Sequence, residues 1–197
     1  MYTSYNYPSV LQVLTFLLMT IRYVYWFLSE KNANKEKPKQ HATTTQELTK
    51  RIITLILGAF ISLQLLGVSV LPFQNNIYVQ YSGLLLVFVS ICISITARIS
   101  LGSNWAHAAE YQIKKGHTLT TDGIYKYIRH PIYTGMFLSC IGAELVTGSY
   151  ILVAFIFILP ATAYFQAKME ERILLKEFGK GYASYMKSTK MFIPFVW

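Results

Sequence analysis

Long apolar runs alternate with polar segments along the whole chain. A membrane-spanning helix needs about 20 mostly apolar residues. Five runs approach that length, at residues 9–28, 52–71, 79–99, 131–147 and 150–167. The last two meet at Thr147-Gly148-Ser149, residue types that favour a tight turn. The pattern predicts an all-α, polytopic membrane protein with about five transmembrane helices.

The basic residues are confined to one side of this arrangement. All but one of the 18 Lys and Arg residues fall in segments 29–51, 98–130 and 168–197. Positively charged loops remain on the cytoplasmic face of a membrane, so five spans place the N-terminus outside and the C-terminus inside. The exception is Arg22, within the first span. We expect its side chain to extend to the cytoplasmic headgroups.

Composition narrows the possible partners. The chain has 53% apolar residues, 14% charged residues and a net charge of +9. Because the positive charge is segregated into loops between spans, it favours the anionic headgroups of a lipid bilayer over nucleic acid. Cys92 and Cys140 lie inside apolar runs, which argues against a disulfide and against a metal site. The N-terminus lacks a basic segment and a cleavage site, so we expect a retained helix.

The chain is predicted to form a single integral membrane domain, residues 1–197. Residues 1–99 supply three helices and a polar segment, 29–50, that we expect to be a flexible loop. Residues 100–197 hold the candidate chemistry. Glu144, late in the fourth span, is expected to be a solvated or hydrogen-bonded structural group near the outer interface.

The segment before the fourth span is too long and too aromatic for a simple connection. Segments of this length without structure of their own are usually functional or disordered, and this one carries Trp105, Tyr111 and Tyr125. It runs into Arg129-His130-Pro131. Proline is favoured in the first turn of a helix, so Pro131 marks the start of the fourth span. Tyr133, four residues after Arg129, can share a helix face with it.

The last segment, 168–188, has the pattern of an amphipathic helix. Apolar residues recur at helical spacing with charges between them, at Met169, Ile173, Leu174 and Phe178. Glu170 and Glu171 open this helix. Gly179 and Gly181 are expected to break it, before Tyr182 and Tyr185.

An acidic pair, an Arg-His pair and several tyrosines therefore converge at one cytoplasmic interface. Carboxylates and tyrosine faces together can hold a cationic ligand. Alternatively, Glu170 and Glu171 pair with headgroups or lysines, and the tyrosines form an interfacial aromatic belt. The spacing alone leaves both interpretations open.

The order of motifs resembles the isoprenylcysteine carboxyl methyltransferase family of membrane-embedded methyltransferases. The resemblance covers about half the chain, residues 98–197, and is strong because several motifs follow in order. The matching motifs are Leu101-Gly102-x-x-Trp105, Gly116-His117-Thr118-Leu119, Gly123-Ile124-Tyr125, Arg129-His130-Pro131-x-Tyr133-x-Gly135, and Glu170-Glu171-x-x-Leu174-x-x-x-Phe178-Gly179-x-x-Tyr182-x-x-Tyr185.

The resemblance implies S-adenosylmethionine as cofactor, in a pocket at the cytosolic face. Carried over residue by residue, the cofactor-binding residues are Glu110, His117, Thr118, Leu119, Thr120, Tyr125, His130, Pro131, Ile132, Tyr133 and Glu170. Glu170 is also expected to act in catalysis by stabilising the sulfonium. Arg129 is the second catalytic candidate, as the group that orients a carboxylate of the acceptor or of the cofactor.

The implied reaction is methyl transfer to a lipophilic acceptor, most simply a carboxylate such as a C-terminal isoprenylcysteine. Gln166 takes the substrate-binding position where eukaryotic members of the family have an arginine, and it lacks the positive fork that pairs with a carboxylate. Three alternatives remain. They are a phospholipid amine N-methyltransferase, which needs a base, an enzyme similar to the NADPH-dependent sterol reductases, and a non-catalytic membrane interaction protein that keeps the fold. The expected location is the endoplasmic reticulum membrane in a eukaryote or the inner membrane in a bacterium.

Overall fold

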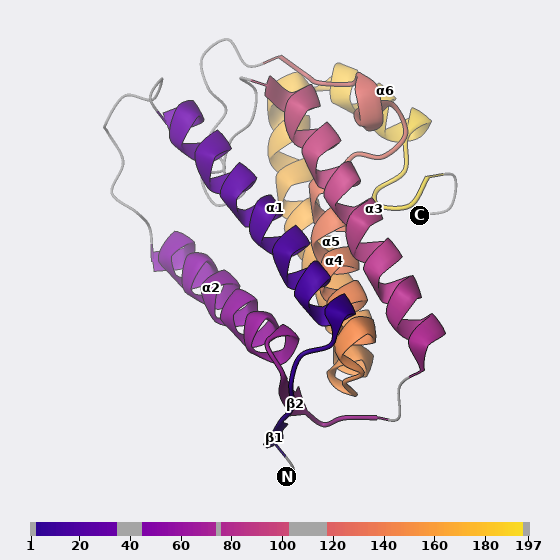
Figure 1. The fold of residues 1–197 in the computed structure, drawn as a ribbon. Helices are drawn as coiled ribbons and strands as arrows, with labels where there is room; N and C mark the ends of the chain where they lie inside the picture. Colours follow the sequence, from indigo (N-terminus) through magenta and orange to yellow (C-terminus); the bar gives the residue numbers. More distant parts are fainter. Residues whose placement is uncertain (1–2, 35–44, 74–75, 103–117, 195–197) are drawn as a thin grey trace. The chain divides into compact units, whose positions relative to one another are not determined.

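The computed structural model describes residues 3–34, 45–73, 76–102 and 118–194 (Figure 1). Within these ranges helices dominate. The elements, in chain order, are β1 (Thr3–Tyr5), α1 (Val10–Asn34), α2 (Thr45–Leu65), β2 (Val68–Val70), α3 (Ile77–Leu101), the 3-10 helix η2 (Gly123–Lys126), α4 (Pro131–Thr147), α5 (Ile151–Phe178) and α6 (Lys180–Ser188).

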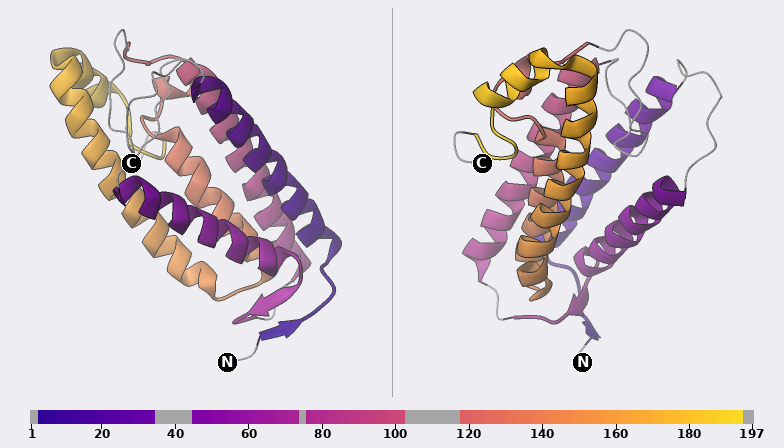
Figure 2. Two further views of the ribbon diagram at one scale, coloured as in Figure 1. Left: turned by 90° about the vertical axis from the view of Figure 1, so that its left-hand side faces the viewer. Right: turned by 180° about the vertical axis from the view of Figure 1, so that it is seen from behind.

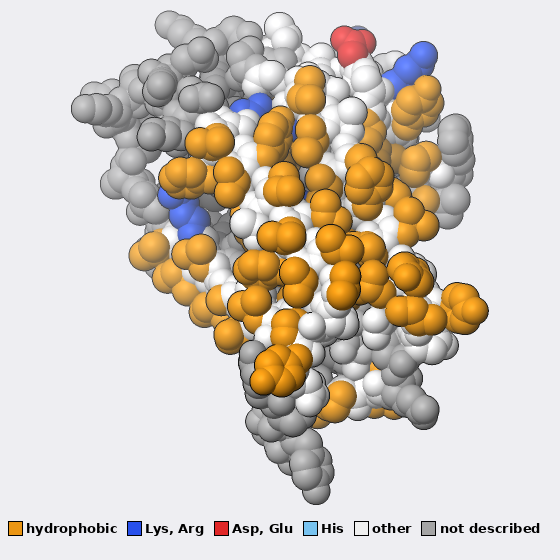
Figure 3. Space-filling model, in the orientation of Figure 1, with side chains coloured by type: hydrophobic (Ala, Val, Ile, Leu, Met, Phe, Trp, Pro, Cys, Tyr) orange, Lys and Arg blue, Asp and Glu red, His pale blue; other side chains and the backbone are white. Residues whose placement is uncertain are grey.

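The helices confirm an all-α membrane protein. Among the described residues, three helices are long and apolar enough to cross a membrane, at Val10–Ser29, Ile77–Leu101 and Ile151–Phe178, and two shorter apolar helices cover Arg51–Leu65 and Pro131–Thr147. Hydrophobic side chains spread over the face in Figure 3 on which α1 and α3 lie toward the viewer. An apolar surface of this extent is suited to contact with lipid.

Two predicted boundaries are wrong. The second apolar run does not remain helical to Leu71, because α2 ends at Leu65 and the chain then enters β2. The predicted loop 29–50 is helical at both of its ends, since α1 continues to Asn34 and α2 begins at Thr45.

Contacts divide the chain into two compact units, each described here by itself. The first unit comprises residues 1–91 and 138–156, and the second comprises residues 92–137 and 157–197. The expected catalytic segment, residues 100–197, stays a prediction.

A short antiparallel ribbon joins α1 and α2 in the first unit. Residues Thr3, Ser4 and Tyr5 of β1 pair with Val70, Ser69 and Val68 of β2. Gly67 precedes β2 with a φ of 107°, a conformation that only glycine adopts readily, and its carbonyl accepts from the Asn6 N–H at 3.0 Å. From this ribbon α1 and α2 diverge in both views of Figure 2.

Helices α3 and α4 approach closely in the first unit because glycines face each other. A Cβ on Gly83 would lie 2.6 Å from the carbonyl oxygen of Gly142, and a Cβ on Gly142 would lie 2.7 Å from that of Gly83. Such small residues allow backbones to meet where lipid supplies no hydrophobic driving force.

A polar pair links α2 and α4 within this unit. Gln64 Nε2 donates to Glu144 Oε1 at 2.8 Å, and both residues are at most 2% exposed. Of the two expected environments for Glu144, solvated or hydrogen-bonded, the structure therefore shows the hydrogen-bonded one. Gln64 Oε1 and Glu144 Oε2 are also buried, and neither has a partner among the described residues. One proton on Glu144 Oε2 would satisfy both, because the acid would then donate to the amide oxygen.

Arg22 departs from expectation. Its Nη1 donates to Ser139 Oγ on α4 at 3.2 Å, so the side chain turns toward the neighbouring helix.

The second unit places α6 across the end of α5 (Figure 2). The break falls at Gly179, as predicted, where φ is 50°. Gly181 does not break the helix, since it lies in the first turn of α6.

The segment after α6 returns to the start of α4. Arg129 N donates to Lys190 O at 2.8 Å, and His130 N donates to Met191 O at 3.0 Å. Thr134 Oγ1 then donates to Phe192 O at 3.0 Å. Because α4 begins at Pro131, these contacts fix the two residues that precede the helix.

We predict that Glu144→Gln retains the stability of the wild type, whereas Glu144→Leu lowers it. The second amide can donate to Gln64 Oε1 and accept from Gln64 Nε2, so the pair keeps two hydrogen bonds. Leucine strands a buried amide, at a cost of about 1–3 kcal/mol. Thermal unfolding in detergent measures both variants. Equal unfolding temperatures for the two would contradict the paired arrangement.

Candidate functional site

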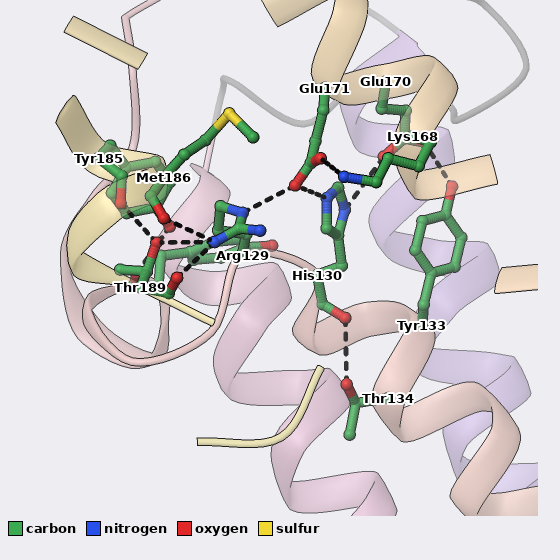
Figure 4. A network of polar contacts seen from close by, with 11 residues as sticks. Arg129, His130, Tyr133, Thr134, Lys168, Glu170, Glu171, Tyr185, Met186 and Thr189 are labelled. Atoms are coloured by element: carbon green, nitrogen blue, oxygen red, sulfur yellow. Dashed lines mark hydrogen bonds and ion pairs between the residues drawn. The ribbon is translucent and has the colours of Figure 1, made fainter. Parts of the chain in front are cut away.

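The Arg129 side chain is bound by groups of the protein itself, on α5 and at the end of α6. Its Nε donates to Glu171 Oε1 at 2.8 Å, with side-chain exposures of only 8% and 3%. Its Nη1 donates to the carbonyls of Met186, at 3.2 Å, and Thr189 (Figure 4). Arg129, two residues before α4, is thus joined to α5 and to the end of α6.

Glu171 is the acid at the centre of this cluster. Besides Arg129, its Oε2 accepts from Lys168 Nζ at 3.2 Å, one helical turn earlier on α5. His130 Nε2 lies 3.6 Å from Glu171 Oε1, which is too long for a hydrogen bond but close enough for ion pairing. These cationic partners compensate the negative charge of Glu171 within the protein.

Glu170 has a different environment, although it is the adjacent residue. Its side chain is 23% exposed, and its Oε2 lies 3.4 Å from His130 Nδ1. The Tyr133 hydroxyl donates to its Oε1. In Figure 4, Glu170, His130 and Tyr133 form one side of the network, and Arg129 with Thr189 forms the other. Glu170 is the less buried of the two acids.

Aromatic rings adjoin Glu170. The rings of His130 and Tyr133 are stacked, with centroids 5.8 Å apart and planes at 27°. A carboxylate beside aromatic rings is the combination that binds organic cations.

His130 carries positive charge more readily than an ordinary histidine. Burial alone disfavours the charged form, but the neighbouring carboxylates Glu170 and Glu171 favour it and raise the pKa of His130. Its Nε2 is buried, with no hydrogen bond to any described residue.

Three tyrosines complete the unit. Tyr185 donates from its hydroxyl to the carbonyl of Tyr125 at 2.6 Å, which ties α6 to η2. Burial raises the pKa of Tyr125, Tyr182 and Tyr185, so all three are neutral phenols. The Tyr182 hydroxyl is buried and has no hydrogen-bond partner among the described residues. These rings are therefore buried, unlike an aromatic belt at the membrane interface.

Some of the predicted site residues fall together and others do not. Arg129, His130, Tyr133 and Glu170 meet in the network of Figure 4, and Pro131 and Ile132 lie in the first turn of α4. Gln166 is one turn before Glu170 on α5 and is partly exposed. Thr118, Leu119 and Thr120 precede η2 outside any helix, with Thr118 exposed. Glu110 and His117 lie outside the described residues.

Sequence reasoning undervalued Glu171 and omitted Thr189. The pair Glu170-Glu171 was identified, but the Arg129 contact falls on the second acid. Adjacent residues on a helix point about 100° apart, so only one of the two acids can face the buried side of α5. The spacing of the apolar residues on α5 was the only feature of the sequence that could indicate which acid does so. Thr189 accepts a hydrogen bond from Arg129 through its backbone carbonyl, and a sequence motif of side chains cannot indicate such a contact.

Comparison with known proteins identifies the family. The model of the phospholipid methyltransferase family matches residues 78–181, more than half of the chain. The chain belongs to this family. The region that matches contains Arg129, His130, Tyr133, Glu170 and Glu171, so the predicted membership of the membrane-embedded methyltransferases is confirmed.

The similar curated proteins share a name. A Schizosaccharomyces pombe protein-S-isoprenylcysteine O-methyltransferase is 32% identical over 103 residues, which cover 51% of this chain and 43% of the relative. The Rattus norvegicus protein of the same name is 31% identical over 121 residues, covering 60% and 42%. The match spans less than half the length of either relative.

A solved structure has a similar fold. The eukaryotic intramembrane Ras methyltransferase, isoprenylcysteine carboxyl methyltransferase, superposes with a TM-score of 0.65 over 91% of this chain and 64% of that chain. Its sequence identity is 22%, so the comparison shows the fold alone.

We predict that Arg129→Met destabilises the protein while Arg172→Met does not. Removing Arg129 leaves the buried Glu171 with Lys168 and His130 only, a loss near the low end of the about 3–5 kcal/mol that breaking a buried pair costs. Arg172 is exposed on the same helix as Glu171 and serves as a matched control. Thermal unfolding in detergent gives the two values. Equal effects would show that the pair does not hold the unit.

We predict that the stabilising effect of His130 decreases as the pH rises. Because its pKa is raised in the folded protein, its contribution is complete below the ordinary value of about 6.5 and is lost as pH passes through the raised pKa. The unfolding temperatures of wild type and His130→Gln, compared across this window, should converge at high pH. A gap that widens with pH would contradict the assigned ion pairs.

Proposed function

We propose that the protein transfers a methyl group from S-adenosylmethionine to a lipophilic acceptor at the membrane, with a carboxylate such as a prenylated cysteine as the preferred acceptor. The observation that carries this proposal is the contrast between the two adjacent acids. Glu171 is 3% exposed and paired with Arg129, whereas Glu170 is 23% exposed and borders two aromatic rings. Glu170 is therefore the acid positioned for a cationic ligand.

The described residues fit the cofactor. When bound, S-adenosylmethionine supplies a methyl group on a positively charged sulfur. Glu170 offers negative charge, the Tyr133 ring offers a π face, and His130 Nε2 is a buried polar atom without a hydrogen bond. A carboxylate and an aromatic face both favour a sulfonium over a neutral thioether. These residues would hold the cofactor, with Thr118 to Thr120 and Tyr125 as further candidates.

Arg129 takes a positioning role in this proposal. Its Nε and Nη1 are occupied by Glu171, Met186 and Thr189, and its side chain is 8% exposed. It pairs with Glu171, so that Glu170 is the acid left on the more exposed side of the cluster, with His130 and the Tyr133 hydroxyl as its partners. The catalytic assignment of Arg129 as a carboxylate ligand stays a prediction.

A carboxylate acceptor suits a site with these residues. A carboxylate is already nucleophilic at neutral pH, so its methylation needs alignment and exclusion of water more than a base. The names of the relatives support this choice, since they act on isoprenylcysteine. Gln166 lies one turn before Glu170 and would offer a neutral hydrogen bond to the acceptor.

A phospholipid amine is the second candidate acceptor, favoured by the description of the matching family. An ammonium group must lose a proton before it attacks a methyl group. Glu170 would then have to accept that proton while it also stabilises the cofactor.

We predict that Glu170→Gln weakens binding of S-adenosylmethionine about 10- to 100-fold, since the substitution removes the negative charge that attracts the sulfonium. Tyr133→Phe, which keeps the ring, should have a smaller effect than Tyr133→Ala. Calorimetry on the detergent-purified protein measures the affinities. Glu177→Gln is the matched control, because Glu177 is an exposed acid on the same helix.

The acceptor is tested by methyl transfer from labelled cofactor in lipid nanodiscs. The expected substrate is a farnesylated cysteine with a free carboxylate, with its methyl ester as the blocked control. Labelling of phosphatidylethanolamine instead would replace the carboxylate by an amine as acceptor. A folded wild type that does not bind the cofactor would overturn the methyltransferase proposal.

A further inference from the structure

Arg22 is a cation within an apolar span, and it has no acidic partner among the described residues. It lies in the span Val10–Ser29, seven residues before Ser29 and so about 10 Å from that end of the span. Its Nη1 donates to Ser139 Oγ at 3.2 Å. Its Nε is buried and has no hydrogen bond to any described residue. A carboxylate within ion-pair distance is likewise missing from the described part of the chain.

A guanidinium in this position requires an anion. Arginine stays charged in proteins and presents five N–H donors in a planar fork, and a charged residue inside a span normally pairs with an opposite charge. Ser139 is neutral, and the described ionisable groups that act electrostatically on Arg22 are Cys140 and Tyr23, both ordinarily uncharged at neutral pH. The buried acid of the same unit, Glu144, is hydrogen-bonded to Gln64 instead.

An apolar groove begins one turn before Arg22 on the same helix. Leu14, Leu18 and Arg22 are spaced four residues apart along α1, and such residues follow one face. The groove has a volume of about 420 Å³ and is lined only by apolar and aromatic residues, Leu14 and Leu18 of α1 and Tyr81, Leu84, Leu85 and Phe88 of α3. It is open at its surface: Leu85 is 63% and Phe88 is 54% exposed.

We propose that Arg22 and Ser139 bind the phosphate of an anionic membrane phospholipid whose acyl chain lies in this groove. The charge of the site complements an anion, and a fork of N–H donors beside a hydroxyl matches the oxygens of a phosphate. The apolar groove next to it fits a chain rather than a soluble anion. A charged side chain at this depth draws headgroups inward by local thinning of the bilayer. The lipid neutralises Arg22 and stabilises the first unit.

The inference is independent of the proposed enzyme activity. The residues proposed to hold the lipid belong to the first compact unit, and Arg129, His130, Tyr133 and Glu170 belong to the second. A bound structural lipid would therefore be detected even in a protein without measurable methyl transfer.

The test compares lipid binding by the full chain with that of variants. Native mass spectrometry should detect phosphatidylglycerol retained by the detergent-purified wild type, and added phosphatidylglycerol should raise its unfolding temperature more than phosphatidylcholine does. Arg22→Met should abolish both effects, and Arg22→Lys should keep part of them. Arg172→Met, which removes an exposed charge, is the matched control.

A second variant keeps the test decisive if Arg22→Met does not fold. Leu18→Trp fills the groove without changing charge, and it should reduce retention of phosphatidylglycerol at least several-fold. Unchanged lipid retention in both Arg22→Lys and Leu18→Trp would overturn the proposal. Unchanged retention with a higher KM for a farnesylated cysteine would also overturn it, because Arg22 would then bind the acceptor carboxylate.

Discussion

The buried ion pair between Arg129 and Glu171 is the contact on which the second unit depends. It joins Arg129, two residues before α4, to the C-terminal part of α5, and the same guanidinium binds the end of α6 through two carbonyls. A buried pair gains little free energy over apolar packing, but breaking it is costly because one charge is left alone. Its contribution here is to hold these three segments together through one guanidinium.

That arrangement separates the roles of two adjacent carboxylates. Because Glu171 is paired with Arg129 and Lys168, the more exposed Glu170 is left with His130 and the Tyr133 hydroxyl as its partners. His130 is shared between them, which links the exposed acid to the buried one. A change at the buried pair would therefore reach a bound cation through His130, without any contact between Arg129 and that cation.

The sequence predicts the helices well where hydrophobic length and turn residues agree, and less well elsewhere. Pro131 and Gly179 mark helix ends because ring closure and a positive φ act locally. The end of α2 was missed because the segment 66–71 is rich in apolar residues, which fit either a helix or a strand. The pairing of residues 68–70 with β1 is a contact distant in sequence. Glu170 and Arg129 were identified as site residues, but their partners depend on the rotation of α5.

Arg22 shows the same limit for charge inside a span. Hydropathy locates the residue along α1, and a long flexible side chain near a helix end is expected to reach water. Which way the guanidinium turns is decided by the neighbouring helix, where Ser139 supplies an acceptor at 3.2 Å. The Ser139 hydroxyl accepts one hydrogen bond from Arg22 but leaves its charge unpaired. In contrast, one proton on Glu144 removes its charge and lets Gln64 and Glu144 satisfy each other's hydrogen-bonding groups. A buried acid has that option and a buried arginine does not, so Arg22 needs an anion from outside the described residues.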